Sequence, residues 1–179
     1  GGVPALALSP DGTTIVTGGQ DSIVRMWTLP AGTVPVSDAS MTLPSINSDG
    51  SRVVTAGYDS QVRLWKVSAA GEMDRAGTIE LPRPLGGGNV VELSPDGKVL
   101  ATTQTSGGHV QLWDVADPEH PAALGAPITT ATRFTWEMAF SPDGRTLAIG
   151  DDDFSVALWD VQDPRNPVRL GERLTGPRN

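Results

Sequence analysis

The chain of 179 residues has no cysteine, only two histidines and a single tyrosine. The absence of cysteine excludes disulfides and thiolate chemistry and leaves the redox compartment undetermined. No apolar run is long enough to cross a membrane and no signal-peptide pattern stands at the start, so we expect a cytoplasmic location without membrane insertion. The 21 glycines and 15 prolines disfavour long helices and favour many short strands joined by turns.

Positive charge is also scarce. The 13 basic residues face 21 acidic ones, which gives a formal net charge of -8. Affinity for nucleic acid comes largely from clustered Lys and Arg, so this balance argues against nucleic-acid binding and favours a protein or peptide partner. The length is compatible with one domain that buries a core.

The residue types needed for catalysis are missing as well. The two histidines, His109 and His120, stand in unrelated loops, and no nucleophile-elbow motif occurs, so we expect no enzyme activity and no cofactor. The dense carboxylate cluster Asp151-Asp152-Asp153 has the chemistry to bind a hard cation such as calcium. Its spacing does not match a calcium loop, however, so a solvated turn is favoured and no metal site is assigned.

What the chain does contain is a repeated segment, best seen at Ser141 to Asp160 (SPDGRTLAIGDDDFSVALWD). Its S-P-D-G start predicts a tight turn, because Pro142 presets φ, Asp143 bonds its own backbone and Gly144 supplies the permissive conformation. The segments T-L-A-I-G and S-V-A-L-W that follow predict two strands of an antiparallel meander, with a second polar turn between them.

Three further copies align with this segment. They begin at Ser9, Ser48 and Ser94 and end, like the first, on a tryptophan: Trp27, Trp65, Trp113 and Trp159. The successive differences of 38, 48 and 46 residues fit the period of about 40 to 45 residues of four-stranded propeller blades. A Trp-Asp pair closes the last two copies, at residues 113–114 and 159–160.

These motifs make the chain resemble the WD-repeat β-propeller family over nearly its whole length. The resemblance implies an all-β fold of four blades, approximately 1–38, 39–82, 83–129 and 130–179, each a four-stranded antiparallel meander. Four blades are expected to form an open arc of a larger ring, because closing them would need about 90° per blade against about 51° in a seven-bladed ring. The exposed end blades then predict contact with further WD repeats of the same chain, or self-association.

The segments after Trp113 and Trp159 share a D-V-x-D-P pattern followed by a second proline and a Leu-Gly pair. This linker style resembles that of bacterial, particularly actinobacterial, WD-repeat proteins. The resemblance implies a non-catalytic protein-interaction scaffold or sensor module, part of a larger signalling or regulatory protein. The alternative is a propeller that binds a small molecule or metal in its central channel, either as a binding protein or as an enzyme.

The family's polar tetrad joins a turn Asp, a Ser or Thr, the Trp and a His. Carried over by alignment, the Asp role falls to Asp21, Asp59 and Asp153, while the His role is vacant. The hydroxyl role falls to a threonine in the first three blades, and Ile149 replaces it in the fourth. The four repeated tryptophans are expected to pack in the core, with each indole N–H finding a partner inside its blade.

In the resembled family the exposed top face carries two kinds of position, which predict protein-binding residues here. Those at the start of the innermost strands are Asn89, Phe134 and Trp136, and those before the turn Asp are Gln20, Tyr58, Ser106 and Asp152. Trp136 is the one tryptophan outside the repeated position, so core packing does not account for it. Two interpretations stay open: an interaction hot spot, or a side chain that fills a gap between blades.

Overall fold

The structure is a computed structural model and describes residues 5–9, 14–18, 23–28, 33–37, 44–56, 59–81, 90–104, 108–130, 132 and 135–176. This part of the chain contains strands and turns and no helix, which confirms the all-β prediction. The predicted turn residues Asp21 and Gln20, like Tyr58, Asn89, Ser106 and Phe134, lie outside the described residues.

Sixteen strands make up the described elements. In chain order they are β1 (Ala5–Leu8), β2 (Thr14–Gly18), β3 (Ile23–Thr28), β4 (Thr33–Ser37), β5 (Pro44–Ile46), β6 (Arg52–Ala56), β7 (Gln61–Val67), β8 (Met73–Glu80), β9 (Val91–Leu93), β10 (Val99–Gln104), β11 (His109–Asp114), β12 (Ala122–Thr129), β13 (Thr135–Phe140), β14 (Thr146–Asp151), β15 (Ser155–Asp160) and β16 (Val168–Thr175).

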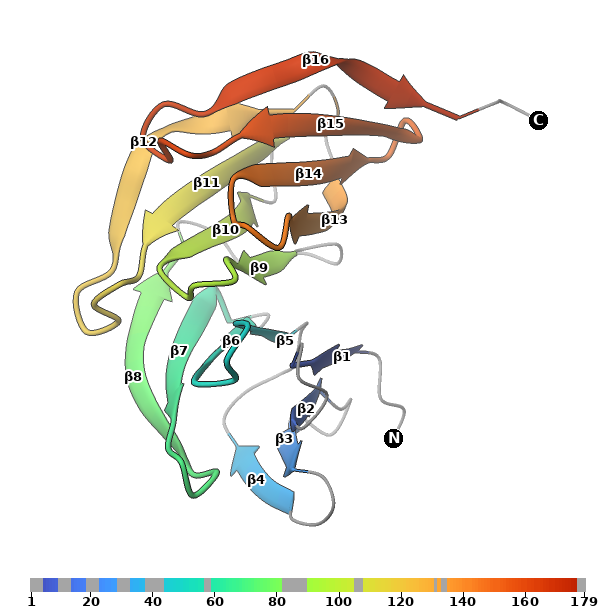
Figure 1. Cartoon of the computed structure of the whole chain (residues 1–179). Coiled ribbons are helices and arrows are strands. Elements are labelled where there is room, and N and C mark those ends of the chain that lie inside the picture. The colour runs from blue at the N-terminus through green and yellow to red at the C-terminus, as the bar shows by residue number, and fades with distance from the viewer. Residues whose placement is uncertain are drawn as a thin grey trace.

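The strands form four sheets of four, each with its strands in sequence order and all pairs antiparallel. Blade 1 contains β1 to β4, blade 2 contains β5 to β8, blade 3 contains β9 to β12 and blade 4 contains β13 to β16. This confirms the prediction of a propeller built from four-stranded meanders. Figure 1 shows the blades side by side in an open arc, with the first strand of each blade on the inside.

The repeated turn between the first and second strands owes its shape to four residues. In blade 3 the Gly97 N–H donates to the Ser94 carbonyl (2.8 Å), and Gly97 has a φ of 70°. Asp96 Oδ1 accepts from the Lys98 N–H (3.1 Å), and Ser94 Oγ accepts from the Val99 N–H (2.9 Å). The turn thus satisfies its own backbone groups, which explains why the short S-P-D-G sequence is enough to join two strands.

The serine of this turn also accepts a backbone hydrogen bond, a role that the turn-forming preferences of proline, aspartate and glycine do not indicate. Ser9 and Ser141 accept the same backbone hydrogen bond as Ser94, from Thr14 and Thr146, each at 2.9 Å. In blade 2 Asn47 takes over, with Oδ1 accepting from the Arg52 N–H at 2.9 Å. The turn of blade 2, which departs from the repeat sequence, is therefore bonded as fully as the others.

The apolar core lies between the blades. Each sheet has a leading face toward the preceding blade and a trailing face toward the following one, because side chains alternate along a strand. Val53 of blade 2 packs against blade 1, whereas its neighbour Val54 packs against blade 3, and both are buried. A third cluster joins blades 3 and 4. Both faces of blades 2 and 3 are thus covered, so these sheets are stabilised by their neighbours.

The two end blades each have one uncovered face. In the described part of the chain, extensive contacts join blade 1 to 2, 2 to 3 and 3 to 4, and none of similar extent joins blade 4 to blade 1. Leu6 and Trp27 on the leading face of blade 1 are exposed, as are Leu170 and Leu174 on the trailing face of blade 4. The open arc predicted from the sequence therefore leaves apolar side chains in water at both ends.

The outer strands carry irregularities in register. The pairing of the third and fourth strands shifts between Leu64 and Trp65 in blade 2, between Val110 and Leu112 in blade 3, and between Val156 and Leu158 in blade 4. Such bulges increase the local twist and bend the outer strand.

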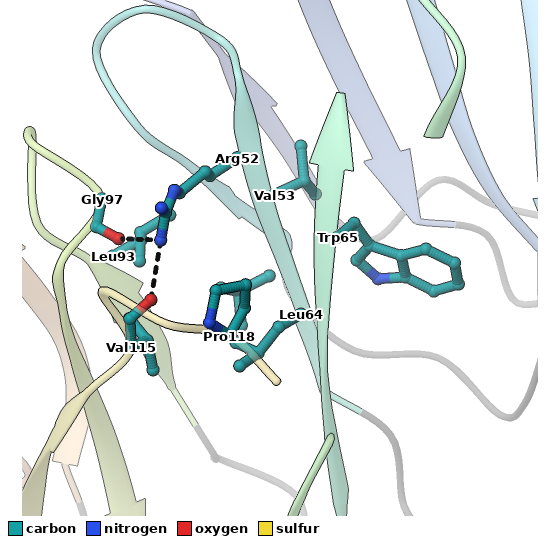
Figure 2. A pocket seen from close by; sticks show the side chains of 9 residues that line it. Arg52, Val53, Leu64, Trp65, Leu93, Gly97, Val115 and Pro118 are labelled. Atoms are coloured by element: carbon teal, nitrogen blue, oxygen red, sulfur yellow. Dashed lines mark hydrogen bonds between the residues drawn. The ribbon is translucent and has the colours of Figure 1, made fainter. Parts of the chain in front are cut away.

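A single arginine ties blade 2 to blade 3. Figure 2 shows Arg52 reaching across to the backbone of the next blade, where Nη1 donates to the carbonyls of Val115 (2.7 Å) and Gly97 (3.1 Å). Nη2 donates to the Ala116 carbonyl at 3.0 Å. The hollow beside this side chain has room for no more than about one water molecule, so it serves packing and holds no ligand.

We expect Arg52→Ala to lower the free energy of unfolding by about 1 to 3 kcal/mol, because three carbonyls lose a charged donor in a partly buried place. Urea denaturation measures the change. Arg145→Ala, at an exposed side chain in the same turn of blade 4, is the matched control and should change stability by less than about 0.5 kcal/mol. Equal losses in the two variants would contradict the tie between blades.

Candidate functional site

The predicted protein-binding positions that the structure describes belong to one end of the blades, which we call the upper rim. At this end the innermost strands begin and turns connect the second strand to the third; in blade 4 it lies on the right of Figure 1. Two of the predicted residues are described, Trp136 and Asp152, and both belong to the upper rim of blade 4. The remaining ones fall outside the described residues.

Trp136 points away from the core. It is 64% exposed, whereas Thr135 before it and Met138 after it are buried. The register between β13 and β14 shifts at this point: Thr135 pairs with Asp151 and Glu137 pairs with Gly150, which leaves Trp136 as the extra residue of a bulge. A bulge redirects a side chain from the regular alternation of the strand. At 64% exposed, Trp136 is not a buried side chain between the described blades, and its role in binding stays a prediction.

A second exposed aromatic residue, Phe154, was not predicted from the sequence as a binding residue. It stands in the turn between β14 and β15, is 90% exposed, and has a φ of 63°. A bulky side chain in the left-handed region is a genuine outlier, and such outliers gather at functional positions. The signal in the sequence was an aromatic residue within a turn of aspartates, at the position that Ser60 holds in blade 2.

The carboxylates of the same rim differ in their partners. Arg173 of β16 forms ion pairs with Asp151 (3.2 Å) and with Asp153 (3.4 Å). Burial raises the pKa of Asp151, with Arg173 acting against it, whereas the Ser155 hydroxyl holds the pKa of Asp153 below its usual range. The side-chain carboxylates of Asp152 and Glu137 have no hydrogen bond or ion pair to any described residue. The rim of blade 4 therefore carries uncompensated negative charge beside two exposed aromatic rings.

The repeated tryptophans are held inside the blades by a common hydrogen bond. The indole N–H donates to a threonine hydroxyl of the neighbouring strand in blades 1, 2 and 3, from Trp27 to Thr17 (3.0 Å), Trp65 to Thr55 (2.9 Å) and Trp113 to Thr102 (3.0 Å). In blade 4, Ile149 offers Trp159 no hydroxyl. Trp65 is buried and Trp113 and Trp159 pack on their clusters, while Trp27 is exposed because no blade covers its face.

The turn aspartates bond to arginine where the resembled family has histidine. Asp59 of blade 2 accepts hydrogen bonds from Arg63, whose side chain is buried, and from the Gln61 N–H. Asp153 of blade 4 accepts from the Ser155 N–H and hydroxyl (3.1 and 2.6 Å) and pairs with Arg173. Both aspartates therefore have partners within their own blade, which makes them part of the structural framework.

The innermost strands also bring several polar side chains together near the axis of the arc. The Ser45 hydroxyl of β5 donates to Glu92 Oε2 of β9 (3.0 Å) and accepts from the Leu93 N–H (2.9 Å). Burial raises the pKa of Glu92 to about 7, and the negative charge of Glu137 on β13 adds to the rise. Three successive blades thus contribute Ser45, Glu92 and Glu137 to one region.

The sequence profile of the family described as WD40, WD domain, G-beta repeat, matches residues 1–28, 30–66, 87–114 and 128–160, well over half of the chain. Each match contains one copy of the turn, the threonine or its replacement, and the tryptophan. The chain belongs to the WD40 repeat family. No curated protein matches it.

WD40 propellers are generally non-catalytic scaffolds that bind protein partners. In the described residues of this WD40 chain, no group of three or more His, Cys, Asp or Glu is placed to hold a metal ion. The same residues include no helix of the length and apolarity that a membrane span requires.

The raised pKa of Glu92 predicts that the stability of the fold depends on pH. Its pKa is about 7 in the fold against an ordinary 4.5, so the folded state holds a proton that the unfolded state releases first. The free energy of unfolding should therefore fall between about pH 4.5 and 7, by about 1 to 3 kcal/mol, and level off above. Glu92→Gln should remove this fall, which urea denaturation at several pH values measures.

The exposed Glu172→Gln is the control, because it removes a carboxyl from the outer strand without touching the innermost strands. It should keep the pH dependence of the parent chain. A parent chain whose stability is constant between pH 4.5 and 7 would show that Glu92 ionises at its ordinary pKa.

Proposed function

We propose that this WD40 chain is a non-catalytic scaffold that binds a protein segment on the upper rim of blade 4, and that the segment carries Lys or Arg. The observation that carries the proposal is the exposure of Trp136 on the bulge of an innermost strand. Water-exposed tryptophan on a rigid sheet is an unfavourable arrangement for a free surface and a favourable one for an interface, where aromatic anchors dominate binding energy.

Phe154 extends the surface outward from Trp136. Trp136 lies on β13 and Phe154 in the turn directly before β15; β14 runs between β13 and β15, so these two strands lie about 10 Å apart. An extended peptide spans this distance with about three residues. The pair therefore fits one partner segment with two contact points, and the ring of Phe154 is accessible to such a segment because the residue is 90% exposed.

The charges of the rim select the partner. Asp152 and Glu137 flank the two aromatic residues in the sequence and have no cation among the described residues. A Lys or Arg side chain gains both an ion pair with such carboxylates and a cation–π contact with an indole face. The net charge of -8 adds a long-range attraction for a basic segment.

The other predicted rim residues, Gln20, Tyr58, Asn89, Ser106 and Phe134, stay predictions. Gln20, Tyr58, Asn89 and Ser106 would extend the same binding surface around the upper rim into blades 1 to 3, and Phe134 would add to it in blade 4. The attachment of this scaffold to a larger signalling or regulatory protein, and its cytoplasmic location, likewise stay predictions from the sequence.

The second candidate, a ligand in the central channel, has one supporting observation. Ser45, Glu92 and Glu137 gather on the innermost strands, and Glu92 is a half-buried carboxyl without a cation among the described residues. Its bond to Ser45 already satisfies one oxygen, however, and a raised pKa leaves it largely neutral below pH 7. We therefore favour the rim, where the side-chain carboxylates of Asp152 and Glu137 have no hydrogen bond or ion pair to a described residue.

The test selects peptides that bind the chain from a displayed library of nine-residue sequences and measures the affinity of the selected peptides. We expect Lys and Arg to be enriched in them. Trp136→Ala should weaken binding by about 2 kcal/mol or more, about 30-fold in Kd, because it removes the central anchor. Since Trp136 is exposed, the midpoint of urea denaturation should stay nearly constant.

Phe154→Gly is a useful companion, because it removes the second ring and also relieves the left-handed backbone. It should weaken peptide binding while leaving stability unchanged or raised by about 1 kcal/mol. Leu174→Ala, at an exposed apolar residue of the outer strand, is the matched control that should leave peptide binding intact. A stability loss of about 3 to 5 kcal/mol in Trp136→Ala, or selected peptides without basic residues, would refute the proposal.

A further inference from the structure

The outer strands of blades 2 and 3 each contain a glycine on which the following blade rests. A Cβ atom added to Gly77 would lie 1.7 Å from the Pro118 carbonyl oxygen, and one added to Gly125 would lie 2.0 Å from the Arg165 carbonyl oxygen. Both carbonyls belong to the turn between the third and fourth strands of the next blade. Each of these glycines is therefore a notch that receives the backbone of a neighbouring blade.

Blade 4 has the same notch, and it is empty. Gly171 follows Leu170 as Gly125 follows Leu124, and the two glycines share a left-handed backbone with φ of 66° and 59°. A Cβ added to Gly171 would meet no described atom within 4 Å. The outer strand of blade 4 thus has the shape that accepts another blade, without a blade upon it.

The apolar residues around Gly171 repeat those of an occupied face. Leu158, Leu170 and Leu174 of blade 4 correspond to the following residues of blade 3, which are buried against blade 4: Leu112, Leu124 and Ile128. Leu170 and Leu174 are exposed, because none of the described blades covers the trailing face of blade 4.

The opposite end of the chain has the complementary face. Leu6, Leu8 and Trp27 on the leading face of blade 1 are exposed. They correspond to Val91, Leu93 and Trp113 of blade 3, which pack against the trailing face of blade 2. The chain therefore carries both halves of one more contact of the kind that joins its own blades.

These two halves do not meet within one molecule, because no extensive contact links blade 4 to blade 1 in the described part of the open arc. We propose that blade 1 of a second copy of this chain docks on the trailing face of blade 4, head to tail, so that its leading face covers Gly171, Leu170 and Leu174. The contact joins two different faces, so repeated docking produces a closed ring or a filament. It uses the faces of the end blades and leaves the upper rim available.

Sedimentation of the 179-residue chain over a range of concentrations tests the docking. We expect the parent chain to associate, and Gly171→Asn to raise the dissociation constant at least about 10-fold, because asparagine accepts a left-handed φ but fills the notch. Gly144→Asn is the matched control. Gly144 has a φ of 70°, and its added Cβ would make only an ordinary contact, with Pro95 at 3.7 Å.

The head-to-tail arrangement is tested by mixing variants. Leu6→Glu should also prevent association, since it places a charge on the leading face of blade 1 at a side chain that is exposed in the single chain. An equal mixture of Leu6→Glu and Gly171→Asn should recover a dimer with a single contact, because each supplies the face that the other lacks. Thermal denaturation of each variant checks that it is folded, and Leu174→Glu replaces Gly171→Asn if that variant is not.

Four outcomes would overturn the proposal. They are a parent chain that stays monomeric at every concentration, Gly171→Asn that associates as well as Gly144→Asn, Leu6→Glu that still associates, and a mixture that recovers no dimer. Association of Leu6→Glu would in particular show that blade 4 pairs with itself.

Discussion

Every blade of this chain depends on having another sheet against each of its faces. A four-stranded meander buries little by itself, because both of its faces carry apolar side chains and the sheet is one layer thick. Val53 and Val54 of blade 2 are adjacent in sequence and are buried against different blades. The stability of such a structure is shared between neighbours, and it declines toward the ends, where Leu6 and Leu174 meet water.

The four blades share this framework but differ in their polar contacts. The threonine that receives the tryptophan N–H occurs in blades 1 to 3, and Ile149 replaces it in blade 4. Blade 4 instead has Arg173 between two aspartates, Asp151 and Asp153. Blade 2 sends an arginine, Arg52, into the backbone of the next blade. The repeats are therefore equivalent in shape and distinct in their polar contacts.

The sequence was most informative where structure is decided locally. The S-P-D-G turn satisfies its own backbone groups, so its four residues were enough to predict the turns and the strands beside them. The exposure of Trp136 could not be deduced, because it results from a bulge in the pairing of two strands. The raised pKa of Glu92 depends on Ser45 and Glu137, which come from other blades. Both features arise from contacts over long sequence distances, and no local motif encodes those.

The irregular register of the outer strands has a consequence for the outer circumference of the arc. A straight outer strand would present a regular row of free N–H and C=O groups, on which any unfolded chain could add a further strand. Here β8, β12 and β16 are bent by bulges, prolines without an N–H stand in β4 and β12, and β16 carries Arg169 and Arg173. These devices oppose amyloid-like growth along the sheet edges and restrict the molecule to contacts between folded surfaces.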